Sequence, residues 1–132
     1  GGYSDLQSGI IRVLHAKSFI EDATRIIRAI RYSVRLEFCI EPETETLMKQ
    51  QIRYIDTING DRLSNELMKI FRETHVSSVL LSAQNRGILR AIYPNLKVYP
   101  QLIRKLERDL DSRNEYTDMI FLSALSLALL IP

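Results

Sequence analysis

The sequence is poor in the residues on which several fold classes depend. Its 132 residues include one cysteine, no tryptophan, 5 glycines and 4 prolines. One cysteine cannot form a disulfide within the chain, so we expect a reducing, cytoplasmic compartment rather than secretion. The scarcity of glycine and proline argues against an all-β sandwich, which needs many tight turns.

A long hydrophobic run is also missing. The most apolar stretch, residues 119–131, is interrupted by two serines and is shorter than the roughly 20 residues that a membrane span needs. We interpret it as a buried helix and expect no membrane partner. The sequence shows no signal-peptide pattern, begins without Met and ends directly after the apolar stretch. These features predict a fragment of a longer protein.

The charges are nearly balanced, with 18 Lys and Arg against 16 Asp and Glu. With 45% hydrophobic residues, the composition is that of an ordinary globular domain. The net charge of +2 permits nucleic-acid binding without arguing for it. Basic residues nevertheless outnumber acidic ones between residues 12 and 35, so we expect that segment to face a nucleotide or RNA.

Hydrophobic periodicity predicts an all-α fold, a bundle-like array of helices after one short strand at residues 9–14. Ser18 and Glu21 have the spacing of a capping box, which predicts a long helix over residues 19–37. Pro42 suits the first turn of a second helix, and Asn59 suits the N-cap of a third. Further helices are expected at 76–86, ended by Gly87, and at 88–93, 101–112 and 115–130.

The first long helix carries the densest polar pattern. Asp22 and Arg25 are three residues apart, which would place them on one helical face. A carboxylate accepts and a guanidinium donates, so the pair could read a base edge with a donor beside an acceptor, as in cytosine or adenine. An ordinary surface ion pair, contributing about 0.2–0.5 kcal/mol, explains the same spacing and is the better supported interpretation from spacing alone.

A longer sequence match favours base recognition over a simple surface ion pair. The segment Gly9-Ile-Ile-Arg-Val-Leu-His-Ala-Lys-Ser-Phe-Ile-Glu-Asp-Ala-Thr-Arg-Ile-Ile-Arg-Ala-Ile-Arg-Tyr resembles the neck of class II tRNA nucleotidyltransferases and bacterial poly(A) polymerases. It carries their Glu-Asp-x-x-Arg motif and the Arg-Ala-x-Arg-aromatic run that follows. Gly60-Asp-Arg-Leu-Ser-Asn-Glu-Leu resembles a downstream Gly-Glu-Arg-x-x-x-Glu-Leu element. The resemblance covers about residues 1–95. One departure is Glu37, which stands where the family commonly has Gly.

The resemblance implies roles for particular residues. Asp22 and Arg25 would hydrogen-bond the base of incoming CTP or ATP. Glu21 falls on the first acidic position of the motif and would hold the helix start. Arg28 would support the triphosphate or the neck.

Two residues match the downstream element. Arg62 and Glu66 would pack against the first helix, and we expect an ion pair between them because they are four residues apart. We do not expect either to contact substrate.

The resemblance also implies a domain layout. Residues 1–14 would be the edge of a catalytic head, residues 15–75 the neck with its base-recognition and RNA-binding helices, and residues 76–132 the start of a helical body. The missing head would hold Mg²⁺, with none bound by this fragment, which we expect to be inactive alone. The expected partners are CTP or ATP, a tRNA or other RNA 3′ end, and the head itself.

Other interpretations stay open. A non-enzymatic helical RNA-binding or protein-interaction module would also fit, with Asp22 and Arg25 as a surface pair. Asp109 and Asp111 have the spacing of a metal-binding pair, but they lie in a late helix and are interpreted as solvated. Cys39, between Phe38 and Ile40, is expected to be buried.

Overall fold

The computed structural model describes residues 2–109 and 120–121, and helices dominate this part of the chain. The α-helices are α1 (Gly2–Ser8), α2 (Ser18–Glu21), α3 (Thr24–Leu36), α4 (Pro42–Gln51), α5 (Gly60–Phe71), α6 (Val76–Asn85), α7 (Ile88–Ile92) and α8 (Pro100–Asp109). A 3₁₀ helix, η1 (Ile52–Thr57), follows α4 directly. The all-α prediction is confirmed. The helix expected at 115–130 lies outside the described residues except at 120 and 121, which are helical.

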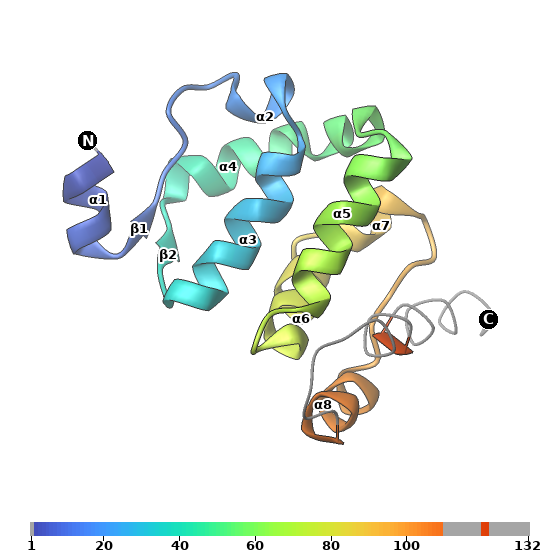
Figure 1. Cartoon of the computed structure of the whole chain (residues 1–132). Coiled ribbons are helices and arrows are strands. Elements are labelled where there is room, and N and C mark those ends of the chain that lie inside the picture. The colour runs from blue at the N-terminus through green and yellow to red at the C-terminus, as the bar shows by residue number, and fades with distance from the viewer. Residues whose placement is uncertain (1, 110–119, 122–132) are drawn as a thin grey trace.

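The only strands in the described part are very short. β1 (Ile10–Ile11) pairs in parallel with β2 (Cys39–Ile40), and α2 and α3 lie between them in sequence (Figure 1). The strand predicted over 9–14 is therefore shorter than expected, and its partner lies within this chain. Residues 2–8, for which no helix was predicted, form α1. Cys39 is exposed, contrary to the prediction, because successive side chains of a strand point to opposite faces and it is the neighbouring Ile40 that packs against the core.

Gly9 allows the chain to enter β1. Its φ is +69°, and a Cβ there would lie 3.5 Å from the ring of Phe38. Its carbonyl accepts a hydrogen bond from the backbone N–H of Cys39, 2.9 Å away. A glycine is needed here because L side chains rarely adopt this backbone conformation.

The long helix predicted over 19–37 is broken at Asp22. This residue has extended backbone angles, φ −152° and ψ 98°, and separates α2 from α3. The predicted capping box is wrong: the Ser18 Oγ accepts from the N–H of His15 instead. Asp22 itself accepts from the N–H of Thr24, because an aspartate can bond its neighbouring backbone in place of continuing a helix.

The later helices follow their sequence signals. The Asn59 side chain accepts from the N–H of Arg62 and caps α5, as predicted. Pro42 begins α4, and Gly87 follows α6 with a left-handed φ of +79°. The predicted helices at 42, 60, 76, 88 and 101 are all confirmed, with ends shifted by a residue or more.

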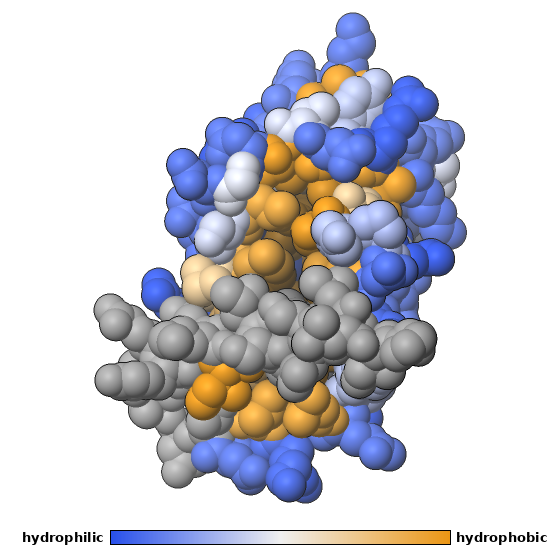
Figure 2. All heavy atoms as spheres, turned by 90° about the vertical axis from the view of Figure 1, so that its right-hand side faces the viewer, coloured by the Kyte–Doolittle hydropathy of each residue, from blue (hydrophilic) through white to orange (hydrophobic). Residues whose placement is uncertain are grey.

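The hydrophobic core joins α3 to the helices that follow it. Ile26, Ile27 and Ile30 of α3 are buried, as the helical period predicts. Phe71 and Phe121 stack with ring centroids 5.7 Å apart. Seen from the side of α5 and α7, apolar side chains fill a hollow between hydrophilic rims (Figure 2). Half-buried hydrophobic residues on α5, α7 and α8 pack against the same core.

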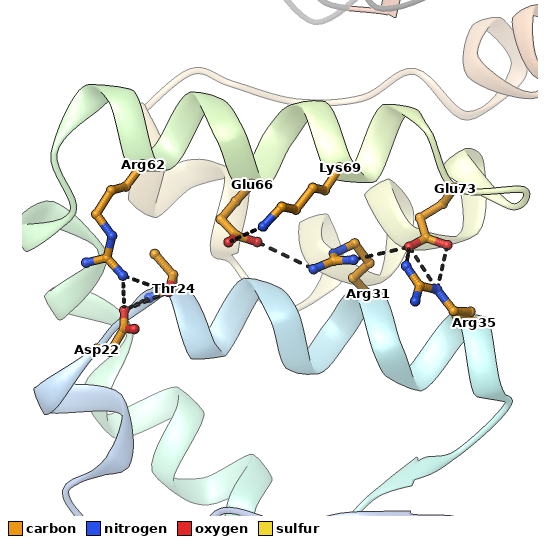
Figure 3. Close-up of polar contacts among 8 residues, drawn as sticks. All are labelled: Asp22, Thr24, Arg31, Arg35, Arg62, Glu66, Lys69 and Glu73. Carbon is orange, nitrogen blue, oxygen red and sulfur yellow. Dashed lines mark hydrogen bonds and ion pairs between the residues drawn. The ribbon is translucent and has the colours of Figure 1, made fainter. Parts of the chain in front are cut away.

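A buried ionic cluster fixes α3 against α5. Arg31 of α3 is only 5% exposed, and its guanidinium lies 3.7 Å from Glu66 and 3.4 Å from Glu73 (Figure 3). Arg35 also binds the Glu73 carboxylate, and Lys69 lies 3.6 Å from Glu66. Because buried charges are costly unless paired, the buried Arg31 requires the carboxylates of Glu66 and Glu73, while Arg35 and Lys69 are half-exposed at the edge of the cluster.

The Glu73 carboxylate is held ionised by its partners. The hydrogen bonds from Arg35 and the nearby charge of Arg31 outweigh the effect of burial and hold the pKa of Glu73 below its ordinary value. Ionised Glu73 therefore stabilises the folded chain above its ordinary pKa, and this contribution is lost as pH falls through the lower folded value.

Replacing Glu73 tests this cluster. Glu73→Gln leaves Arg31 without a full counter-charge, so we expect a loss of about 3 kcal/mol in the free energy of unfolding at pH 7. The difference from the wild type should shrink as pH falls below about 4.5. Urea unfolding at several pH values measures this difference in the free energy of unfolding. The control is Glu43→Gln at an exposed position, whose free energy of unfolding should stay within about 0.5 kcal/mol of the wild-type value. A constant difference across this pH range would contradict the assignment.

Glu37 is strained at the end of α3. It has φ 55° and ψ 39°, the left-handed region, which costs a non-glycine residue about 1 kcal/mol. Glu37→Gly should therefore raise the free energy of unfolding by about 0.5–1 kcal/mol, seen as a higher melting temperature. The matched control is Lys49→Gly within α4, which should lower it by about 1 kcal/mol. Equal losses in both variants would show that the strain at Glu37 is not released.

Candidate functional site

Asp22 lies where α2 ends and α3 begins, and one of its two carboxylate oxygens accepts several hydrogen bonds. Its Oδ1 accepts from the Thr24 N–H at 3.1 Å, from the Thr24 hydroxyl at 2.6 Å and from Arg62 Nη2 at 2.9 Å (Figure 3). Among the described residues, all of these bonds go to Oδ1. The second oxygen, Oδ2, is therefore available to accept a bond from a ligand.

The same contacts keep Asp22 ionised. Partial burial favours the neutral acid, but the hydrogen bonds from Thr24 and Arg62 and the Arg62 charge outweigh it and hold the pKa of Asp22 below its ordinary value. At neutral pH the group is an acceptor without a proton to donate. That property suits recognition of an exocyclic amine.

Arg25 lies in the first turn of α3 and does not pair with Asp22. Its Nη1 donates to the carbonyl of Ser18 at 3.0 Å and lies 3.6 Å from Glu21. The surface ion pair between Asp22 and Arg25, the alternative raised by their spacing, is therefore absent from the structure. Residues three apart share a face only along one continuous helix, and the extended backbone of Asp22 breaks that helix.

Glu21 was predicted to hold the helix start, but its carboxylate contacts other side chains instead. Its carboxylate faces Arg25 and also lies 3.4 Å from His15 Nε2. His15 Nδ1 accepts from the N–H of Lys17 at 3.2 Å, so neutral His15 carries its proton on Nε2, facing Glu21. Glu21 therefore orients Arg25 rather than capping a helix.

Arg28 is exposed on α3 and acts on Tyr32, one turn further on. Burial raises the pKa of the Tyr32 phenol, but a hydrogen bond from Arg28 and the charges of Arg31 and Arg28 lower it by more. Arg31 and Arg35 also lie over the Tyr32 ring, at 4.8 and 5.2 Å. No contact in the described part of the chain joins Arg28 to Asp22 or Arg25.

Arg62 and Glu66 bind α3 and its N-terminal approach instead of each other. Arg62 donates to Asp22, and Glu66 faces Arg31. The predicted ion pair between them is wrong, since both side chains have partners across the helix interface. Their predicted packing against the first helix is confirmed.

Thr24 and Arg62 were not expected to hold the candidate base-reading carboxylate. Thr24 could have been found, because an aspartate two residues before a threonine at a helix start is a frequent capping pattern. The bond from Arg62 joins residues 40 apart in sequence. No local pattern signals that contact.

The described residues contain no group of three or more His, Cys, Asp or Glu side chains that could hold a metal. Asp111 of the Asp109–Asp111 spacing lies outside them. None of the described helices is long and apolar enough to cross a membrane.

The chain is similar to RNA-processing polymerases. Residues 37–99 match the family described as "Probable RNA and SrmB- binding site of polymerase A". An A-adding tRNA nucleotidyltransferase of Geobacter sulfurreducens is 43% identical over 109 residues, covering 81% of this chain and 12% of that protein. A multifunctional CCA protein of Chromobacterium violaceum is 33% identical, covering 73% of this chain and 24% of that protein.

Solved structures agree with these relatives. A CCA-adding enzyme in complex with ATP is 37% identical with a TM-score of 0.78, covering 83% of this chain and 28% of that one. The Thermotoga maritima CCA-adding enzyme complexed with tRNA is 36% identical, with the same TM-score and coverage. The chain thus spans less than a third of these proteins. On the motifs, the identities and the fold together, it belongs to the class II tRNA nucleotidyltransferase family.

Proposed function

We propose that this chain gives a template-independent RNA nucleotidyltransferase its base selection and part of its RNA binding. The observation that carries the proposal is the Asp22 carboxylate, held ionised by Thr24 and Arg62 with Oδ2 available, close in sequence to the half-exposed Arg25. An acceptor and a donor at one helix start are what a base edge requires.

The chemistry selects cytosine and adenine. Asp22 accepts from N4 of cytosine or N6 of adenine, while Arg25 donates to N3 of cytosine or N1 of adenine. Guanine and uracil present the opposite order of donor and acceptor, so they leave both side chains unpaired. The substrates that we propose are therefore CTP and ATP.

Nucleotidyl transfer needs groups beyond the described residues, which hold no candidate metal cluster. We propose that a catalytic head elsewhere in the protein binds Mg²⁺ and carries the chemistry, with residues 1–14 at its edge, 15–75 as neck and 76–132 as the start of the body. The chain alone should not add nucleotides.

The proposed acceptor is the 3′ end of tRNA. Relatives named for A addition and for CC addition resemble this chain, and so does a CCA-adding enzyme whose structure is complexed with tRNA. A tRNA substrate and a single exposed cysteine both agree with a cytoplasmic location.

Substitution of the base-reading pair tests the proposal. In the full-length protein, Asp22→Ala and Arg25→Ala should each reduce discrimination for C and A over U and G about 10- to 100-fold, because one base contact is worth about 1–3 kcal/mol. Competing incorporation of the four nucleotides measures this, and RNA affinity should change little. Exposed Asp61→Ala is the control. Wild-type discrimination in both variants would overturn the assignment.

Arg62 should act on the base through Asp22. Arg62→Ala removes one cause of the lowered pKa of Asp22, so that pKa rises and base recognition is lost at a higher pH than in the wild type. In the pH profile of kcat/KM for ATP, the fall on the acid side should move to higher pH. Arg62→Lys keeps the positive charge and should move the profile part of the way back toward that of the wild type. A uniform loss of rate without any change in the pH profile would indicate a purely structural role.

A further inference from the structure

An open pocket of about 490 Å³ lies between the start of α6 and α8, outside the base-reading site. Its lining consists of Ser77, Gln101, Arg104, Glu107 and Arg108. Four of these five residues come from α8, which begins directly after the segment 37–99 that matches the RNA-binding family. The base-reading role uses none of them.

The donors of this pocket share one face of α8. Gln101, Arg104 and Arg108 are at positions i, i+3 and i+7, which lie above one another along a helix. Both arginines are exposed, and neither has an ion pair or hydrogen bond within the part of the chain that the structure describes. Two unpaired guanidinium groups and an amide therefore face the same opening.

The acidic residue in the pocket is already engaged. The Glu107 carboxylate accepts from the backbone N–H of Ser77 at 3.1 Å and from its hydroxyl at 2.7 Å. Ser77 is in the first turn of α6, where the helix dipole is positive and favours a carboxylate. Glu107 is thus held by α6, and the two arginines keep their charge available for a ligand.

We propose that this pocket binds phosphate groups of the RNA backbone. Guanidinium groups donate in a planar fork that fits phosphate oxygens, and an open pocket admits a polymer rather than enclosing a small molecule. Figure 1 shows α8 and α2 at opposite ends of the molecule. The proposal places the RNA 3′ end near Asp22 and its backbone on α8. The inference rests on the proposed function and assigns the RNA contact to particular residues.

The test measures RNA affinity against salt. In the full-length protein, Arg104→Ala/Arg108→Ala should lower the salt dependence of binding to a tRNA lacking its CCA end by about 1.5 log units per log unit of KCl. Affinity near 0.15 M KCl should fall about tenfold or more. Selection among the four nucleotides at saturating RNA should not change, because Asp22 is untouched.

Lys105→Ala is the matched control, since Lys105 is an exposed cation on the same helix but does not line the pocket. It should change the salt dependence much less than the double substitution, and circular dichroism should show equal helicity in all variants. Equal salt dependence in the double variant and the control would overturn the pocket proposal alone. Failure of the wild type to bind RNA would instead overturn the proposed function. A polyglutamate peptide that binds the wild type but not the double variant, with RNA binding unaffected, would assign the pocket to an acidic protein.

Discussion

The structure depends on one buried charge, the guanidinium of Arg31 between Glu66 and Glu73. Apolar contacts are less directional than ion pairs, so they constrain the position of α5 along α3 less sharply than a buried charge does. An arginine that is 5% exposed tolerates few positions, since its charge must stay close to both carboxylates. The cluster therefore fixes how α5 lies along α3, and this places Arg62 beside Asp22.

The two ends of the α3–α5 interface differ in what they do. At one end, Arg35 and Arg31 enclose Glu73 and serve stability. At the other, Arg62 holds an Asp22 carboxylate that keeps a free oxygen. The polar contacts along one interface thus run from a stabilising cluster to the proposed base-reading carboxylate at the start of α3. A change in the buried cluster would move Arg62 and so affect a site that it never touches.

The sequence predicted most of what depends on local pattern. The isoleucines of α3, the Asn59 cap and the turn at Gly87 follow from periodicity and capping preferences, and the structure confirms them. Errors arose where a local signal had a competitor. Ser18 and Glu21 fit a capping box, but the Ser18 hydroxyl accepts from His15 and Asp22 breaks the helix. The spacing of Arg62 and Glu66 fits an ion pair, but in the structure Arg62 binds Asp22 and Glu66 faces Arg31. Contacts across 40 residues leave no trace in a local pattern, so those partners could not be predicted from spacing.

The break at Asp22 explains why an aspartate suits this position better than other residues. A helix-forming residue would continue α2 into α3 and turn the chain away from its observed path. Asparagine could also bond the Thr24 N–H, but it carries no charge for Arg62 and presents an amide nitrogen where the base offers its own amine. Aspartate combines the turn, the ion pair and an acceptor for the proposed base contact. The backbone geometry and the proposed recognition chemistry therefore both favour an aspartate at position 22.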